Sequence, residues 1–371
     1  MRRKNPSHII NYFWQRRREL LDTAFWVHVG RAAKERLVRP VSSTQFHATL
    51  RALERRPWSL RLEVTNICNA NCIFCAYQYQ TRTEMVMDER VFQKALNDYC
   101  AIGGGDLAFQ VTVGDPLVDK EFVKRVREAR RRPQIRDIST VTNGILLYKH
   151  GISEVLTSGL NSIFISLAGF DEEMYRTVYR NDNYAKMRDN VYALLKANSE
   201  MGNLVKITLG FRTTLSISET LSLPDYQPMK RFPHEASCQT YYGSWGNSIR
   251  QQDLLGVMRL MPPLSKVDKE PCHWLYQGPV IYSDGRVGLC GCQDYNVASE
   301  LVVGHIMEES LESIWQSQRV RKLRERFRES NLPDICSTCT MYQNLDLYRN
   351  RRGSERGKLI EHIYPAGGIP E

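Results

Sequence analysis

Three cysteines stand close together in the sequence TNICNANCIFCAY, as Cys68, Cys72 and Cys75. Three thiolates on one loop can hold three irons of a [4Fe-4S] cubane, and the fourth iron then keeps an open position. A structural zinc site needs four protein ligands, and no fourth ligand stands nearby in the sequence. The spacing therefore favours an iron–sulfur cluster with one open iron.

This cysteine loop resembles the signature of the radical S-adenosylmethionine (AdoMet) superfamily. That signature is Cys-x3-Cys-x2-Cys with an aromatic residue before the last cysteine, which is Phe74 in this chain. The resemblance implies that the open iron chelates the amino and carboxylate groups of AdoMet. It also implies that an electron from the cluster cleaves the S–C5′ bond, and that the 5′-deoxyadenosyl radical removes a hydrogen atom from a substrate.

A second match follows the second predicted strand, in the sequence VGDPL of residues 113–117. Gly114, Asp115 and Pro116 stand where the family has a Gly-Gly-Glu-Pro motif, whose backbone carbonyls would receive the AdoMet amino group. Val113 and Asp115 depart from that motif. Taken alone, a Gly-Asp-Pro sequence indicates only a turn.

Three polar residues close the next predicted strands. Asn143 lies in the Thr-Asn-Gly sequence 142–144, and Ser166 begins a Ser-Leu-Ala-Gly sequence where related enzymes have Ser-Leu-Asp-Gly. The resemblance implies that Ser166 contacts the AdoMet ribose or carboxylate. Arg212 could pair with the AdoMet carboxylate. The alternatives are an ordinary strand-end cap for Ser166 and a solvated side chain for Arg212.

A second group of cysteines lies near the C-terminus, as Cys272, Cys290, Cys336 and Cys339. Together with Gly285, their spacing resembles the auxiliary-cluster domain of the SPASM and twitch group of radical AdoMet enzymes. The full SPASM pattern carries further cysteines that are missing here. The resemblance therefore implies one auxiliary [4Fe-4S] cluster, and spacing alone leaves a four-cysteine zinc site as the alternative.

Three cysteines fall outside these two sets. Cys292 is either an alternative ligand or a spectator. Cys100 falls in a predicted helix, and we expect its side chain to pack in the protein core. Cys238 lies near the predicted sixth strand. A thiol pointing from there into a barrel could return a hydrogen atom to a substrate radical, and the alternative is a simple packed thiol.

Strands alternate with helices over the first two thirds of the chain, which predicts a parallel sheet with right-handed crossovers. The six predicted strands are 59–65, 107–113, 138–143, 161–168, 204–211 and 236–242. Six units are too few for a complete eight-stranded barrel. We therefore expect an α/β fold, a partial (β/α)6 TIM-like barrel with functional residues at the carboxyl ends of its strands.

The alternation stops near residue 250. A β-hairpin is predicted over 279–290, with a turn at Asp284 and Gly285, and a helix over 310–327. These patterns divide the chain into four parts. They are a basic helical segment (1–57), a barrel (58–250), a small auxiliary-cluster domain (251–345) and a C-terminal tail (346–371).

The charge of this 371-residue chain is unevenly distributed. Residues 1–57 hold 13 Lys and Arg against four Asp and Glu, and they supply nearly all of the net charge of +10. The amphipathic helices expected over 8–37 could lie on an anionic membrane surface, bind an acidic partner, or pack against the barrel with a solvated basic face. The nearly neutral main body argues against nucleic-acid binding. No secretory signal or membrane span is apparent, so cytoplasmic or membrane-peripheral localisation is expected.

The motifs predict an enzyme that uses AdoMet and an external low-potential electron donor such as flavodoxin or ferredoxin. We expect it to dehydrogenate a small polar molecule, such as a sugar or an aminocyclitol. One alternative is cross-linking, epimerisation or oxidation of a ribosomal peptide. Another is a non-catalytic, cysteine-rich zinc protein that binds nucleic acid.

Overall fold

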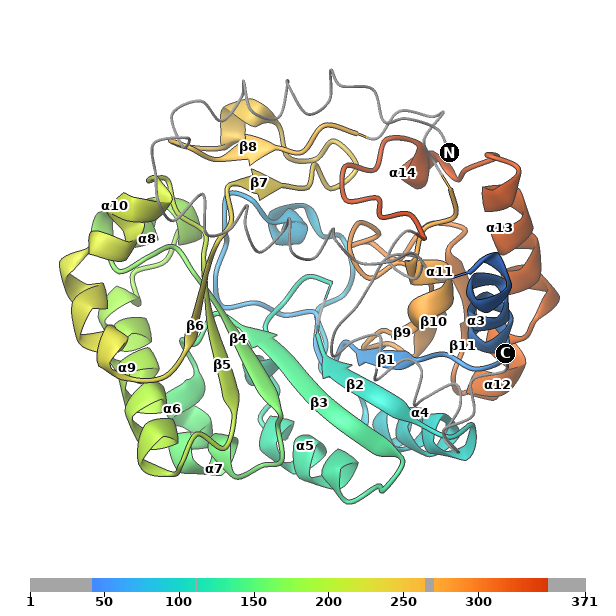
Figure 1. Ribbon diagram of the computed structural model, residues 1–371, viewed down its shortest axis with the longest axis horizontal. Coiled ribbons are helices and arrows are strands. Elements are labelled where there is room, and N and C mark those ends of the chain that lie inside the picture. Colours follow the sequence, from blue (N-terminus) through green and yellow to red (C-terminus); the bar gives the residue numbers. More distant parts are fainter. Residues whose placement is uncertain (1–41, 111, 264–269, 346–371) are drawn as a thin grey trace.

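The computed structural model describes residues 42–110, 112–263 and 270–345. Its centre is a nine-stranded sheet in which six parallel strands follow one another in chain order, as Figure 1 shows. These strands are β1 (Ser59–Leu62), β2 (Gly105–Phe109), β3 (Ile135–Thr142), β4 (Ser162–Leu167), β5 (Lys206–Phe211) and β6 (Glu235–Cys238). The predicted partial TIM-like barrel is thereby confirmed.

Helices cover the outer face of the barrel sheet (Figure 1). They are α4 (Glu89–Ala101), α5 (Phe122–Arg130), α6 (Leu147–His150), α7 (Ile152–Leu156), α8 (Glu172–Tyr179), α9 (Tyr184–Glu200) and α10 (Ile217–Ser222). Several begin at a residue whose side chain accepts a hydrogen bond from the first turn. Asp88 caps α4 and Asp171 caps α8 in this way.

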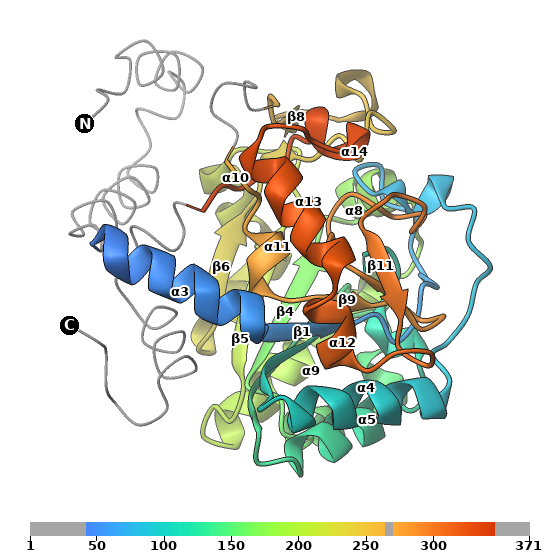
Figure 2. The ribbon, with the colours of Figure 1, turned by 90° about the vertical axis from the view of Figure 1, so that its right-hand side faces the viewer.

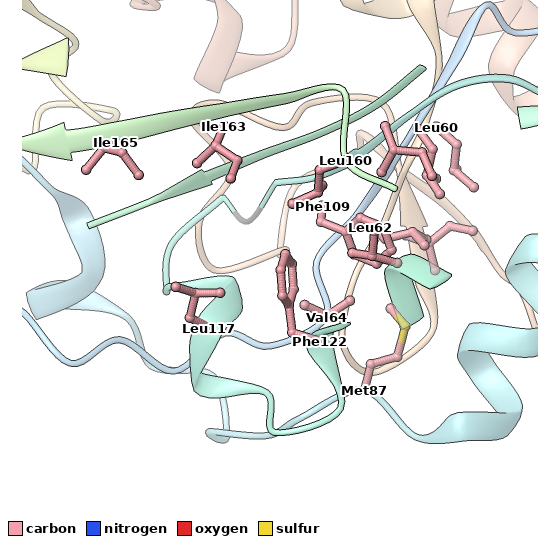
Figure 3. Close-up of a cluster of buried hydrophobic side chains, with 14 of the residues drawn as sticks. Leu60, Leu62, Val64, Met87, Phe109, Leu117, Phe122, Leu160, Ile163 and Ile165 are labelled. Carbon is pink, nitrogen blue, oxygen red and sulfur yellow. The ribbon is translucent and has the colours of Figure 1, made fainter. Parts of the chain in front are cut away.

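The core lies between the sheet and these helices. In β2 and β4 every second residue is buried, because those side chains face the helices while the others line the inside of the barrel. Figure 3 shows part of the resulting cluster, in which Leu62, Phe109 and Ile163 from three strands meet Phe122 from α5. The inner face of the sheet carries both polar and apolar side chains, such as Ser162 and Phe164 in β4.

The C-terminal part of the chain continues the same sheet. Its elements are β7 (Tyr241–Tyr242), β8 (Arg259–Leu260), α11 (Trp274–Gln277), β9 (Val280–Ile281), β10 (Arg286–Gly288), β11 (Val302–His305), α12 (Leu311–Trp315), α13 (Gln318–Arg328) and α14 (Asp334–Ser337). The hairpin of β9 and β10 is the predicted one, and β9 pairs in parallel with β1. The sheet therefore crosses the predicted boundary between barrel and auxiliary domain, and the division at residue 250 remains a prediction.

Two predicted elements are divided in the structure. The predicted sixth strand becomes β6 and β7, because β7 leaves the barrel sheet and pairs with β8 in a separate two-stranded sheet. The predicted helix over 310–327 becomes α12 and α13. Ser317 separates them, because its side chain accepts a hydrogen bond from Val320 N–H and starts a new helix.

Helix α3 (Ser43–Arg55) packs on the C-terminal part of the chain, beside α11 and α13 in Figure 2. The indole of Trp315 donates a hydrogen bond to the carbonyl of Leu53 at 2.9 Å. The basic helices predicted over 8–37 lie outside the described residues. Among the described helices none has the length and apolar character that crossing a membrane would require.

Candidate functional site

The cysteine loop follows β1 and is held against the end of α8. Asn71 N–H donates to the carbonyl of Tyr179 at 3.1 Å, and Ile73 N–H donates to the carbonyl of Val178 at 2.9 Å. The indole of Trp245 donates to the carbonyl of Phe74 at 3.0 Å, which adds a contact from beyond β6. The backbone between the cysteines is thus fixed by partners from two distant segments.

The three thiols of this loop are free and partly buried. Burial raises the pKa of Cys75 to about 11 and raises the pKa of Cys68 and Cys72 above its usual value. The positive charge of Arg212 opposes this rise in pKa at Cys72 and Cys75. Iron binds thiolates, and cluster assembly must therefore displace protons from these thiols.

The predicted Gly-Asp-Pro loop packs directly on the cysteine loop. Asp115 N–H donates to the carbonyl of Ile67 at 2.9 Å. Gly114 has φ +124°, and a Cβ there would lie 3.0–3.1 Å from backbone atoms of Thr65, Asn66 and Ile67. Both the conformation and the close approach require glycine at this position.

The side chain of Asp115 is occupied by protein donors. Its buried carboxylate accepts hydrogen bonds from Leu117 N–H at 3.0 Å, from Asn143 N–H at 2.7 Å and from the Thr142 hydroxyl at 2.9 Å. Burial raises the pKa of Asp115 to about 6 despite these donors. The amide of Asn143 in turn donates to Asn69 Oδ1 at 2.7 Å. Asp115 and Asn143 thus tie the ends of β2 and β3 to the cysteine loop.

Asp115→Asn is expected to lower the free energy of unfolding by about 1–3 kcal/mol, because an amide leaves buried donors unsatisfied. Anaerobic denaturant unfolding measures the change. Asp171→Asn is the matched control, since asparagine caps a helix as well as aspartate does and should change stability by only a few tenths of a kcal/mol. Equal losses in both variants would contradict the role assigned to the buried carboxylate.

Ser166 and Arg212 meet at the carboxyl ends of β4 and β5. The hydroxyl of Ser166 lies 2.9 Å from the Tyr179 hydroxyl and accepts a hydrogen bond from Arg212 Nε at 3.3 Å. The guanidinium of Arg212 lies 5.8 Å from the ring centroid of Phe74 and 5.7 Å from that of Phe164. The structure thus brings Phe74, Ser166 and Arg212 together, and their contacts with AdoMet remain a prediction.

Cys238 does not join this group. The strand register pairs it with Phe211, and residues paired across parallel strands share one face of the sheet. Phe211 packs on Tyr226, with ring centroids 5.2 Å apart, and Cys238 contributes to the raised pKa of the same tyrosine. The register therefore places Cys238 on the same face of the sheet as Phe211, and its role as a hydrogen-atom donor stays a prediction.

The second group of cysteines lines one small, mainly apolar cavity in the C-terminal part. Five thiols meet there, from Cys272, Cys290, Cys292, Cys336 and Cys339. The sulfur atoms of Cys290 and Cys292 lie 3.9 Å apart, and this contact holds the pKa of Cys290 below its usual range. The four predicted ligands are brought together, and Cys292, predicted to be a spectator or an alternative ligand, lies in the same cavity.

A buried arginine beside these cysteines was not apparent from the sequence. The side chain of Arg61 stacks on Trp274, with its Cζ 3.8 Å from the ring centroid, and its Nη2 donates to the carbonyl of Gly278 at 3.3 Å. Nε and Nη1 have no hydrogen-bond partner in the part of the chain that the structure describes. Five thiols that can bind iron lie beside a buried cation that can balance negative charge. Together they fit a negatively charged iron–sulfur cluster.

The described residues contain no group of three His, Cys, Asp or Glu side chains that could hold a single metal ion. In a cubane each cysteine binds a different iron, so its ligands need not converge on one point.

Family models match two parts of the chain. The model described as the radical SAM superfamily matches residues 62–222, and the SPASM model, an iron–sulfur cluster-binding domain, matches residues 272–340. A [4Fe-4S] cluster, an auxiliary cluster and AdoMet are the cofactors that these domains imply. The non-catalytic zinc protein is therefore overturned as an alternative.

Curated relatives resemble a limited part of the chain. GTP 3′,8-cyclase of Petrotoga mobilis is 27% identical over 143 residues, which cover 37% of this chain and 42% of the relative. GTP 3′,8-cyclase of Rhodopirellula baltica is 27% identical over 186 residues, which cover 49% of this chain and 50% of the relative. The chain thus spans about half the length of the curated relatives it matches.

Two solved structures share the fold. BtrN in complex with AdoMet and 2-DOIA has a TM-score of 0.51 at 15% identity, over 76% of this chain and 92% of BtrN. SuiB of Streptococcus suis, bound to precursor peptide SuiA, has a TM-score of 0.55 at 14% identity, over 82% of this chain and 76% of SuiB. The shared fold agrees with the partial barrel, and the two domain matches identify the chain as a member of the radical SAM superfamily that carries a SPASM iron–sulfur cluster-binding domain.

Proposed function

We propose that this enzyme dehydrogenates a small polar molecule. The observation that carries the proposal is the parallel pairing of β9 with β1, Arg61 with Val280 and Leu62 with Ile281. This pairing fixes the five-cysteine cavity to the strand that leads into the cysteine loop. The two candidate cluster sites are therefore attached to one continuous sheet.

The proposed ligands of the two clusters come from different parts of the sheet. Those of the AdoMet-binding cluster are Cys68, Cys72 and Cys75. Those of the auxiliary cluster are Cys272, Cys290, Cys336 and Cys339. When bound, the first cluster and AdoMet supply the 5′-deoxyadenosyl radical, and the second offers an acceptor for the electron that a dehydrogenation releases.

The surrounding residues would bind and orient AdoMet. The carbonyls of the Gly114–Pro116 loop are offered to the AdoMet amino group, and Arg212 offers its guanidinium to the carboxylate. Ser166 holds Arg212 in place through its hydroxyl, since it accepts the hydrogen bond from Nε. Phe74 adds a cation–π contact to the same guanidinium.

The electron count supports a need for the second cluster. Conversion of a secondary alcohol to a ketone removes one hydrogen atom, which passes to the 5′-deoxyadenosyl radical, and then one electron and one proton. The proton can leave to solvent, and the electron needs an acceptor. An external low-potential donor such as flavodoxin or ferredoxin would supply the electron that starts each turnover.

Polar side chains on the inner face of the barrel support a small polar substrate. A cavity of about 390 Å³ lies between this face and α11, within the range of small-molecule sites. Its wall includes Asp106, Gln110, Asp137, Ser139 and Ser162. These side chains can hydrogen-bond hydroxyl and amino groups. The cavity lies mainly beside the amino ends of the strands. The cysteine loop lies at their carboxyl ends, so a substrate bound in the cavity would have to extend along the strands to reach it.

A ribosomal peptide is the second candidate substrate. Two open grooves of about 690 and 710 Å³ flank Ser337 and Thr338 in the C-terminal part. One groove is lined by Trp245 and Tyr295, and the other by Leu260 and Met261. Grooves of this size and mixed polarity could hold an extended chain. They favour modification of a peptide by cross-linking, epimerisation or oxidation.

The deciding experiment uses the anaerobically reconstituted full chain with AdoMet and a reductant. We expect 5′-deoxyadenosine to form faster when a substrate is present, and a dehydrogenated product to be two mass units lighter than its substrate. Sugars and aminocyclitols are compared with a panel of peptides in parallel. Stimulation by peptides alone would replace the small-molecule proposal, and absence of 5′-deoxyadenosine under every condition would contradict both.

A further inference from the structure

A buried arginine on the first barrel strand faces the cysteines of the C-terminal part. We propose that Arg61 is the counter-cation of the auxiliary cluster and that it raises the reduction potential of that cluster. The inference rests on the proposed function, because it assumes that the five-cysteine cavity holds an iron–sulfur cluster. It assigns a positioning role to a residue outside both cysteine motifs.

The position of Arg61 is defined by burial and by two close contacts. Its side chain is buried, with 3% of the residue exposed, and one face stacks on Trp274. A Cβ on Gly291 would lie 2.0 Å from Nη1 and 2.6 Å from Cζ. The guanidinium therefore lies directly against the backbone between Cys290 and Cys292, and only glycine at 291 allows this approach.

The negative groups that act most strongly on the charge of Arg61 are thiols and a phenol rather than carboxylates. The titratable groups that raise its pKa are the thiols of Cys272, Cys290 and Cys292 and the phenol of Tyr282. Burial acts in the opposite direction and is the larger effect, so the pKa of Arg61 is lowered. A buried cation is unfavourable unless a negative group lies close by.

A cluster held by four thiolates provides that negative group. The net charge of a [4Fe-4S] core with four thiolates is negative and becomes more negative on reduction, so a fixed cation stabilises the reduced form more than the oxidised form. Net charge and burial are among the properties that set cluster potentials. A raised potential makes the cluster a better acceptor of the electron that dehydrogenation releases.

The same strand connects the two cluster sites. Arg61 lies in β1, and the chain continues from β1 into the cysteine loop. A shift of β1 would therefore move the guanidinium and the cysteine loop together. The counter-cation is supplied by the barrel and the thiols by the C-terminal part, which explains why no motif in either part reveals it.

The test isolates the auxiliary cluster in a background in which Cys68, Cys72 and Cys75 are replaced by alanine. Iron and sulfide are measured first, and the midpoint potential is then measured by a redox titration followed by electron paramagnetic resonance. Arg61→Met is expected to shift the potential to a more negative value. Arg61→Lys keeps the charge and should stay closer to the background variant.

Arg324→Met is the matched control. Arg324 is equally buried in the C-terminal part, stacks on Trp315 with its Cζ 4.6 Å from the ring centroid, and donates from Nε to the carbonyl of Leu275 at 3.0 Å. No cysteine is among the groups that act on its pKa. Its substitution should leave the potential of the auxiliary cluster unchanged.

Each outcome decides the inference. Arg61→Met with full iron and an unchanged potential overturns it. Loss of iron from Arg61→Met, with retention in Arg61→Lys and Arg324→Met, supports it, because only the charge beside the cysteines then matters. Loss of iron from Arg61→Lys as well overturns it. If the background variant itself contains no iron, the proposed ligands of the auxiliary cluster are wrong. This result differs from a failure of the Arg61 proposal, because Arg61 is unaltered in the background variant.

Discussion

Replacing Cys68, Cys72 and Cys75 together by alanine will abolish formation of 5′-deoxyadenosine and reduce the iron content from about eight to about four atoms per chain. The reason is that the loop carries every proposed protein ligand of the AdoMet-binding cluster. The five-cysteine cavity is built from other residues and should keep its cluster. Iron and sulfide analysis of anaerobically reconstituted protein, with chromatographic detection of 5′-deoxyadenosine, measures both effects.

Cys100→Ala is the control for the loss of a thiol as such. Cys100 lies in α4 and is partly buried, away from both cysteine groups in the fold. Its substitution should leave the iron content and the cleavage of AdoMet unchanged. If the triple variant instead kept its full iron content, the cysteine loop would not hold a cluster. If it lost all iron, assembly at the two sites would be linked and their assumed independence would be wrong.

Glu63→Ala is expected to reduce the free energy of unfolding by about 3–5 kcal/mol, because it leaves a buried cation without its partner. The carboxylate of Glu63 lies 2.6 Å and 3.1 Å from the Nη atoms of Arg82. The side chains of both residues are almost completely buried. Ser283, in the β9–β10 turn, donates to the same carboxylate from its hydroxyl at 3.2 Å and from its N–H at 3.3 Å.

This carboxylate therefore connects β1, the segment after the cysteine loop and the C-terminal hairpin. Its loss should also loosen the pairing of β9 with β1. Anaerobic denaturant unfolding gives the change in stability, and hydrogen exchange at the β9 amides reports the loosening. A stability loss below about 1 kcal/mol would show that Arg82 finds solvent or another partner, against the arrangement described above.

Glu172→Ala provides the comparison for an exposed ion pair. Glu172 lies 3.0 Å from Arg176 on α8, and both side chains are more than half exposed. An exposed pair contributes about 1 kcal/mol or less, since water screens both charges. The difference between the two variants measures the effect of burial rather than the effect of removing a glutamate.

Local patterns predicted most of the barrel. Helix α9 follows such a pattern, because its apolar residues recur with helical spacing and are buried. Alternating burial in β4 follows from the two different faces of the strand. Such patterns depend only on near neighbours in the chain. For the same reason they did not reveal that β9, with two residues, pairs with β1.

The cysteine motifs, through their resemblance to the radical AdoMet and SPASM signatures, predicted the cofactors and the class of enzyme, because cluster ligands recur at fixed short intervals in the sequence. Only the tertiary structure decided what surrounds those ligands. It paired Cys238 with Phe211, since the strand register fixes the face on which each side chain lies. It brought Cys292 to the auxiliary ligands and placed Arg61 against them. Such contacts join residues far apart in the chain, as do Glu63 and Ser283, 220 positions apart, and depend on sheet register and burial rather than on spacing.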